Sequence, residues 1–295
     1  MDQGKRLQNL GRSCERVGLT TSCRLPVTGS QDVRNLRTPQ CGAAFRQDTL
    51  PKREDMSAKR CYTCDMAPTP SLGILNLEQG PGAATRAPRN HSILNPTSYD
   101  FPVILETVAG AWAEIVIRGD PALEPAYISA AQRLIERGAV VITANCGFSI
   151  RHQAAVAASV KVPVVTSSLL LLPTILRQLP KAAKIAVLTA DSTHLGEDLL
   201  GVDPADRSRV VVGGIEGGEM WQNEMKRPTP QTEVSVIERE VGACVARLRN
   251  EHPAIAAILF ECTAFPLVAP TMRRVTKLPI YDITTLCRLT LASVA

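Results

Sequence analysis

Short apolar runs recur along the chain from residue 71 onward, and each has the length of a buried β-strand. They occupy residues 72–77, 139–145, 162–167, 184–190, 209–214, 254–261 and 278–283. The segments 123–138 and 236–248 instead place apolar residues on one face of a helix, and the first of them stops at Gly138, a residue suited to a helix C-terminus. Apolar strands alternating with amphipathic helices indicate an α/β fold with parallel sheets.

The two halves of this pattern repeat each other. Cys146 lies 17 residues before Pro163, and Cys262 lies 17 residues before Pro279. An acidic residue also follows the first strand of each half, Glu78 in one and Asp191 in the other, so that matching positions lie 113 to 116 residues apart. A repeat of this length predicts two similar α/β lobes that arose by duplication. We expect the first lobe to comprise residues 71–180 plus 275–295 and the second to comprise 181–274.

Residues 1–70 differ in composition from the rest of the chain. They hold 12 Lys and Arg against 7 Asp and Glu, while residues 71–295 hold 21 of each kind, so the whole net charge of +5 comes from this segment. Without helical or strand periodicity, it is expected to be a disordered basic segment. Its seven acidic residues argue against a transit peptide. The neutral remainder has no basic surplus for nucleic acid, and no nucleic-acid partner is expected.

The nine cysteines suggest thiol chemistry rather than disulfides. No apolar signal-like stretch lies near the N-terminus, so a reducing, cytoplasmic location is expected. Cys61 and Cys64 form a lone CxxC without a second pair, which supports zinc only weakly, and neither a metal nor a cofactor is expected. No apolar run approaches the roughly 20 residues that span a bilayer, so no membrane partner is expected.

Cys146 and Cys262 each follow an apolar run, at the end of a strand where ligands of parallel α/β sheets bind. Free cysteine is more often a small core residue, but matched positions in two halves favour a functional pair. Two facing thiols suit a two-base epimerisation, in which one removes a proton and the other returns it. Hydroxyl and acidic side chains at the strand ends are expected to bind substrate: Glu78, Thr166, Ser167, Ser168, Thr189, Asp191, Ser192 and Thr263.

Five segments carry a resemblance to a known superfamily: GAVVITANCGFS (138–149), VPVVTSSLLLLP (162–173), IAVLTADS (185–192), ILFECTAFP (258–266) and LPIYDITTL (278–286). They resemble the Asp/Glu racemase superfamily, which includes amino-acid and hydantoin racemases, maleate isomerases and arylmalonate decarboxylases. The resemblance implies two pseudosymmetric flavodoxin-like lobes with the active site in the cleft between them. It also implies cofactor-independent chemistry on a small carboxylate, and it places Cys146 and Cys262 as the acid/base pair. Besides a small carboxylate substrate, a second copy of the chain in a homodimer is the expected partner.

The residues beside the two cysteines depart from the amino-acid racemases. Gly147 and Phe148 replace Asn and Thr donors, Glu261 replaces Gly, and Ala264 replaces His or Glu. We therefore expect Asn145, Gly147 and Glu261 to contribute to a different recognition of substrate.

The expected function is that of a cofactor-independent racemase or isomerase of a small carboxylate, an amino acid or a related acid. Two alternatives remain open: a decarboxylase or cis–trans isomerase with one essential cysteine, and a carboxylate-binding protein without catalysis. A hydrolase dyad of cysteine with His152 or His194 is less favoured, since most such histidines are structural. Cys244 and Cys287 fall on the apolar faces of helices and are expected to pack in the core, and GGIEGG (213–218) fits a loop better than a phosphate-binding motif.

Overall fold

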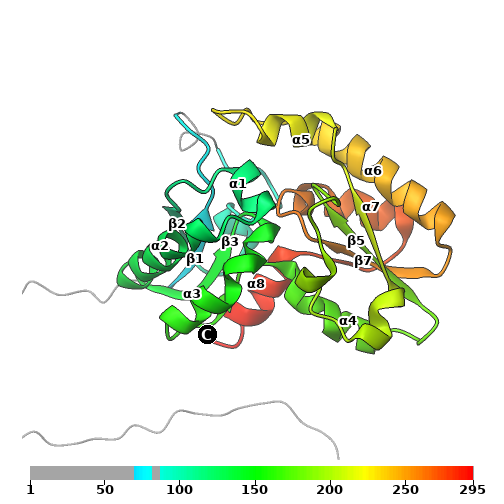
Figure 1. Ribbon diagram of the computed structural model, residues 1–295, viewed down its shortest axis with the longest axis horizontal. Coiled ribbons are helices and arrows are strands. Elements are labelled where there is room, and N and C mark those ends of the chain that lie inside the picture. The colour runs from blue at the N-terminus through cyan, green and yellow to red at the C-terminus, as the bar shows by residue number, and fades with distance from the viewer. Residues whose placement is uncertain (1–69, 82–86, 295) are drawn as a thin grey trace, which may run out of the picture. The chain divides into compact units, whose positions relative to one another are not determined.

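The structure, a computed structural model, describes residues 70–81 and 87–294 of the chain. Within this range the chain forms two four-stranded sheets, each flanked by helices (Figure 1). The expectations for residues 1–69, including those for Cys61 and Cys64, lie outside the described residues.

The first sheet is entirely parallel, with the strand order β2-β1-β3-β4. Its strands are β1 (Ser71–Asn76), β2 (Val103–Thr107), β3 (Ala139–Ala144) and β4 (Val164–Val165). The helices α1 (Ala113–Arg118), α2 (Glu124–Glu136) and α3 (Gln153–Ser159) connect them. As expected, α2 ends before Gly138, whose φ of 95° suits glycine best.

The second sheet repeats this arrangement, with the order β6-β5-β7-β8. Its strands are β5 (Lys184–Thr189), β6 (Val210–Gly214), β7 (Ile255–Phe260) and β8 (Ile280–Tyr281). The remaining helices are α4 (Leu172–Gln178), α5 (Glu219–Glu224), α6 (Val234–Glu251), α7 (Ala269–Thr276) and α8 (Ile283–Leu291). The α/β class and the two-lobed parallel architecture expected from the sequence are thus confirmed.

The repeat extends to details of strand pairing. The pairing between β1 and β3 shifts register between Ser71 and Leu72, and that between β5 and β7 shifts at the equivalent place, between Lys184 and Ile185. The equivalent pairs Ile142–Val164 and Ile258–Ile280 join the third and fourth strands of each sheet. Equivalent positions therefore lie 113 to 116 residues apart, as in the sequence.

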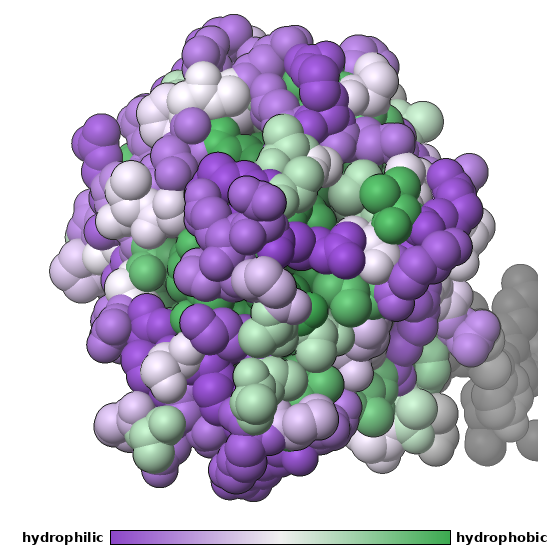
Figure 2. Space-filling model, turned by 90° about the vertical axis from the view of Figure 1, so that its right-hand side faces the viewer, coloured by the Kyte–Doolittle hydropathy of each residue, from purple (hydrophilic) through white to green (hydrophobic). Residues whose placement is uncertain are grey.

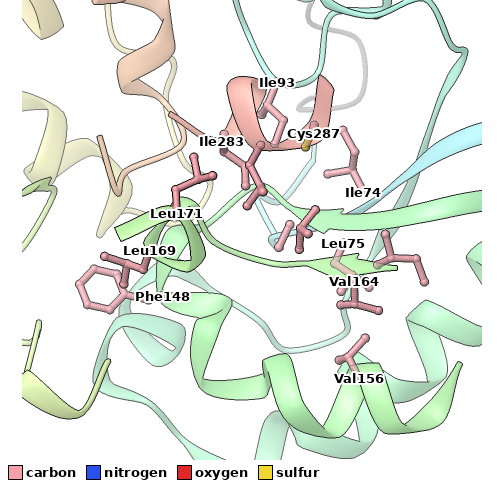
Figure 3. Close-up of a cluster of buried hydrophobic side chains, with 14 of the residues drawn as sticks. Ile74, Leu75, Ile93, Phe148, Val156, Val164, Leu169, Leu171, Ile283 and Cys287 are labelled. Atoms are coloured by element: carbon pink, nitrogen blue, oxygen red, sulfur yellow. The ribbon is translucent and has the colours of Figure 1, made fainter. Parts of the chain in front are cut away.

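The C-terminal segment 275–295, assigned to the first lobe from the sequence, divides between the two sheets. Strand β8 pairs with β7 in the second sheet. Helix α8 packs instead against β3, and its Ile283 and Cys287 are fully buried in the core of the first lobe. Figure 3 shows both side chains beside Ile74 and Ile93. The last helix therefore completes the apolar core of the lobe that begins the fold.

Among the described strands, β2 is the one that the apolar pattern did not predict. It lies at the edge of the first sheet, and all five of its residues are at least partly exposed. The expected strand at 162–167 is much shorter, because only Val164 and Val165 pair with β3. Cys244 is buried on α6, as expected.

The face on the right of Figure 1 is covered mainly by hydrophilic side chains, with apolar residues gathered in small separate patches (Figure 2). Within residues 70–81 and 87–294, every helix is too short or too polar to cross a membrane.

Candidate active site

A cavity of about 150 Å³ lies where the carboxyl ends of the two sheets meet. Residues of both lobes line it, including Cys146 from the first lobe and Cys262 from the second. The two thiols therefore open onto one cavity, the arrangement that the sequence repeat suggested.

Both cysteines occupy equivalent places in their lobes. Strand β3 ends at Ala144, and Cys146 immediately precedes a short 3-10 helix, η4 (Gly147–His152). Strand β7 ends at Phe260, and Cys262 lies two residues further on, shortly before η8 (Phe265–Val268). Both side chains are partly buried.

The cavity favours the neutral form of both thiols. Burial raises the pKa of Cys146, and the carboxylate of Glu261 raises it further. The same two causes raise the pKa of Cys262, and negative charge on the sulfur of Cys146 raises it further. Backbone N–H groups oppose the rise: those of Phe148 and Ser149 at Cys146, and that of Ala264 at Cys262. A thiolate here needs further positive charge, which a cationic ligand can supply.

Glu261 is the most deeply buried carboxyl group in the cavity wall. Its side chain is fully buried, and burial raises its pKa to about 7. Thr189 Oγ1 donates a hydrogen bond to Oε2 at 2.7 Å. The other oxygen, Oε1, makes no hydrogen bond to any residue that the structure describes. Near neutral pH this group is able both to hold and to release a proton.

Asn145 is the counterpart of Glu261 in the first lobe. Each residue directly precedes a cysteine, and each backbone N–H donates to the neighbouring strand, to Leu75 O and Leu188 O respectively. The amide of Asn145 is satisfied on both sides, because Nδ2 donates to Asn76 Oδ1 at 2.6 Å and Oδ1 accepts from the Leu77 N–H at 2.7 Å. At equivalent positions, therefore, one lobe has an amide that is hydrogen-bonded through both its nitrogen and its oxygen, and the other has a carboxyl group with one unbonded oxygen.

Gly147 allows the two lobes to meet at this point. A Cβ atom on Gly147 would lie 2.3 Å from both the backbone oxygen and Oε1 of Glu261. No side chain fits at such distances, so the close approach requires glycine. Gly147 and Glu261, two of the four residues that depart from the amino-acid racemases, therefore pack against each other.

Other polar side chains expected at the site form hydrogen bonds within the protein, and of these Thr263 also lines the cavity. Thr263 Oγ1 donates to the backbone oxygen of Asn145 and joins the lobes beside the cysteines. Ser168, fully buried, donates to the Phe260 oxygen at 2.7 Å. Thr166 donates to Gln153, and Ser167 accepts from the Leu169 N–H. These three residues, 166–168, do not line the cysteine cavity.

Glu78, Asp191 and Ser192, which were also expected to bind substrate, do not line the cysteine cavity. Glu78 accepts a hydrogen bond from the Gly110 N–H and lines a neighbouring, larger cavity. Ser192 donates to Glu216 at 2.7 Å. Asp191 is buried and accepts a hydrogen bond from the indole Nε1 of Trp221 at 3.1 Å.

Trp221 and its neighbours on α5 are cavity residues that the sequence did not single out. Met220, Trp221, Glu224 and Met225 all contribute to the wall, and Arg89 lines it from another segment. Asp191 fixes the orientation of the indole. The sequence did contain a signal, because Trp221 and Glu224 follow shortly after the GGIEGG loop (213–218) and lie about one helical turn apart.

The histidines do not support a hydrolase dyad. His152 stacks on Tyr127, with 4.3 Å between ring centroids, and His194 contacts Asp191. Neither lines the cavity of Cys146 and Cys262. Among the described residues, no cluster of three or more His, Cys, Asp or Glu has the arrangement of a metal site.

The fold is that of a known class of two-lobed enzymes. Allantoin racemase from Klebsiella pneumoniae superimposes with a TM-score of 0.51 at 11% identity, over 76% of this chain and 87% of that one. At this identity the similarity concerns the fold alone, and it agrees with the architecture that the superfamily resemblance implied. No family model matches the chain.

Sequence comparison gives a more particular relationship. The chain is 35% identical over 227 residues to the dimethylsulfoniopropionate lyase of Durusdinium sp. clade D, covering 72% of this chain and 71% of that protein. It is 31% identical over 238 residues to dimethylsulfoniopropionate lyase 3 of Emiliania huxleyi (strain CCMP1516), covering 77% of this chain but only 61% of that protein. The chain belongs to the dimethylsulfoniopropionate lyase family.

Proposed function

We propose that this protein is a lyase that cleaves dimethylsulfoniopropionate by β-elimination, with a cavity thiol as the base. The observation that carries the proposal is the placement of two thiols in one small cavity of a chain that belongs to this lyase family. The sequence alone favoured a racemase or isomerase, whose chemistry also begins with removal of a proton beside a carboxylate. The same first step serves elimination when a leaving group stands on the next carbon.

The reaction needs one base and no cofactor. A thiolate takes the proton from the carbon next to the carboxylate, and the C–H electron pair becomes the new carbon–carbon double bond. The bond from the neighbouring carbon to sulfur breaks, and its electron pair leaves with neutral dimethyl sulfide. Acrylate remains, and the proton stays on the thiol until solvent removes it. One thiol is sufficient because no proton returns to the substrate.

Cys146 is the better candidate for the base. Two backbone N–H groups, of Phe148 and Ser149, favour its thiolate, whereas only that of Ala264 favours the thiolate of Cys262. In this scheme Cys262 forms the opposite wall as a neutral thiol. The cationic sulfonium group of the substrate supplies the positive charge that the thiolate needs in a buried site.

The charged groups of the cavity match the two ends of the substrate. The face of Trp221 and the carboxylate of Glu224 suit the sulfonium cation. Arg89 is the one Lys or Arg among the described residues that line the cavity, and it suits the carboxylate. Met220 and Met225 offer apolar surface to the methyl groups.

Release of dimethyl sulfide into the headspace, together with acrylate in solution, tests the proposal. We expect the wild-type protein to form both in equal amounts, and Cys146→Ala to abolish the reaction. Cys262→Ala should keep measurable activity if one thiol suffices. Cys244→Ala removes a thiol on α6, outside the cavity, and serves as the matched control.

Two outcomes would contradict the proposal. If the wild-type protein released no dimethyl sulfide from dimethylsulfoniopropionate, the proposed elimination would be refuted. An equal and complete need for both thiols, with exchange of an α-hydrogen of a chiral carboxylate in deuterated water, would instead favour the two-base racemase that the sequence suggested.

A further inference from the structure

Asp191 is a buried carboxyl group that contacts the cavity wall from behind. It follows β5, is 2% exposed and does not itself line the cavity. Its Oδ1 accepts hydrogen bonds from the backbone N–H and the hydroxyl of Thr193, and its Oδ2 accepts from the indole Nε1 of Trp221 at 3.1 Å. His194 Nδ1 lies 3.1 Å from the same Oδ2. Burial raises the pKa of Asp191, but the hydrogen bonds that it accepts lower the pKa below its usual value, so the group is ionised.

Trp221 belongs to a short helix that other elements hold in place. Helix α5 has only six residues and packs on α6 (Figure 1). Glu240 of α6 accepts hydrogen bonds from the backbone N–H groups of the first two residues of α5, at 2.7 and 3.3 Å. The indole has a single N–H donor, and Asp191 accepts it. Glu240 therefore fixes the start of the helix, and Asp191 fixes the direction of the ring that lines the cavity.

A carboxylate on the indole N–H also changes what the ring binds well. The edge of an aromatic ring is positive and its face is negative, and the face attracts cations. A negative charge at the N–H edge polarises the ring further and makes the face more negative. An uncharged ligand of the same shape gains little from this change. A carboxylate behind Trp221 can thus favour a cation in the cavity without touching it.

From this geometry we infer that Asp191 is a positioning residue for the sulfonium cation, which holds the indole of Trp221 in the cavity wall and strengthens the attraction of its face for positive charge. The inference rests on the proposed lyase function and adds to it a residue outside the cavity. The substrate is then selected by its charge as well as by its shape. A thioether carboxylate of similar size, which lacks the positive charge, binds less tightly.

Two ligands of nearly the same shape test this role. One is dimethylsulfoniopropionate, and the other is isocaproate, in which a C–H group replaces the sulfonium sulfur. We expect the KM of the wild-type protein for the first to lie below the inhibition constant of the second. Asp191→Asn should raise that KM about 10-fold and change kcat less, because an amide oxygen held by Thr193 leaves its NH2 group facing the indole N–H. The inhibition constant of isocaproate should hardly change, whereas damage to the cavity would weaken both ligands.

A second variant and a control separate the indole from the charge alone. Trp221→Phe keeps an aromatic face but has no N–H donor, so in this background Asp191→Asn should have little further effect on KM. Asp282→Asn is the matched control. Asp282 is also 2% exposed and also accepts from the hydroxyl group two residues later, that of Thr284 at 2.6 Å, but it precedes α8 and lies outside the cavity wall. It should leave both constants unchanged.

The outcomes that would overturn the inference are distinct. Equal affinity of the wild-type protein for both ligands would do so, whether or not Asp191→Asn folds. An equal loss of affinity for both ligands in Asp191→Asn would show a structural role only. An undiminished effect of Asp191→Asn in the Trp221→Phe background would show that the charge acts without the indole.

Failure of the lyase proposal would be seen separately, as a wild-type protein that forms no dimethyl sulfide. Both ligands can then be titrated by calorimetry, because neither is consumed. Tighter binding of the cation, lost in Asp191→Asn, would still support the role of Asp191, and equal binding of the two ligands would overturn it.

Discussion

Gly147 and Glu261 occupy one contact between the lobes, in which the backbone of the first residue packs directly on the carboxyl group of the second. A glycine after one cysteine and a glutamate before the other are separated by more than a hundred residues in sequence. The missing Cβ at Gly147 leaves the room that the Glu261 side chain occupies. The contact links the shape of the cavity to its acid–base chemistry.

Gly147→Ala should therefore damage stability and activity together. The added Cβ would meet the backbone oxygen and Oε1 of Glu261 at 2.3 Å, and a backbone atom has little freedom to move. We expect a loss of about 1–3 kcal/mol in the free energy of unfolding, the usual cost of overpacking. Urea unfolding followed by circular dichroism measures it. Gly242→Ala, on α6, is a control for loss of glycine as such, since its Cβ would meet only the end of the Met272 side chain, at an ordinary contact distance of 3.7 Å. Equal stability of Gly147→Ala and the wild type would show that the lobes adjust.

Thr189→Val should move the pH dependence of the site upward. The hydrogen bond from Thr189 to Oε2 favours the ionised carboxyl group, so its removal raises the pKa of Glu261 above its value of about 7. A hydrogen bond to a charged group contributes about 1.5 kcal/mol, which corresponds to a shift of about one pH unit. The inflection of kcat/KM with pH measures it. An inflection at the wild-type position would mean that another group titrates there.

Glu261 should also make the protein less stable as the pH rises. The pKa of a glutamate carboxyl group is 4.5 when it is unperturbed, and that of Glu261 is about 7 in the folded protein, so between these pH values only the folded state holds the proton. The stabilisation that this group contributes is complete below about pH 4.5 and is progressively lost as the pH rises to about 7. The loss is on the order of 3 kcal/mol.

Urea unfolding of the wild type and Glu261→Gln at pH 5 and pH 8 measures this difference. The glutamine variant should gain stability relative to the wild type at the higher pH. Glu106→Gln should show no such gain, because Glu106 pairs with Arg133 and Arg137 at a partly exposed position. A constant difference between wild type and Glu261→Gln at both pH values would contradict the prediction.

Trp221→Leu should weaken substrate binding more than the chemical step. Loss of the aromatic face beside a sulfonium cation costs about 1–2 kcal/mol, so KM should rise about 5- to 30-fold while kcat changes less. Trp112→Leu is the matched control, because Trp112 stacks with Arg227 outside the cavity, 4.6 Å from ring centroid to guanidinium carbon. An unchanged KM for Trp221→Leu would place the cation elsewhere.

The apolar pattern was sufficient for the general fold and for the position of the two cysteines just after equivalent strands, because buried parallel strands leave a strong signal in sequence. The matched spacing of Cys146 and Cys262 reflects the repeated sheet order, in which equivalent strands end at the same edge. Strand β2 escaped prediction because it lies at the edge of its sheet and is partly exposed throughout.

The remaining features of the site depend on three-dimensional contacts that spacing does not reveal. The run 166–168 reads as a set of free hydroxyl donors, but Ser168 and its neighbours form their hydrogen bonds with the protein itself. Trp221 reaches the cavity because Asp191, thirty residues earlier, accepts its indole N–H. Gly147 and Glu261 were recognised as departures, but their contact required the folded chain.

Helix α8 makes the folding of the first lobe depend on residues that are synthesised long after its strands. Ile283 and Cys287 fill the core beneath β1 and β3, strands that the ribosome completes far earlier (Figure 3). The first lobe cannot close its apolar face until residues 283–291 have emerged, and the second sheet lacks β8, its edge strand, until just before that point. Neither lobe can therefore complete its fold before residues 280–291 have been synthesised.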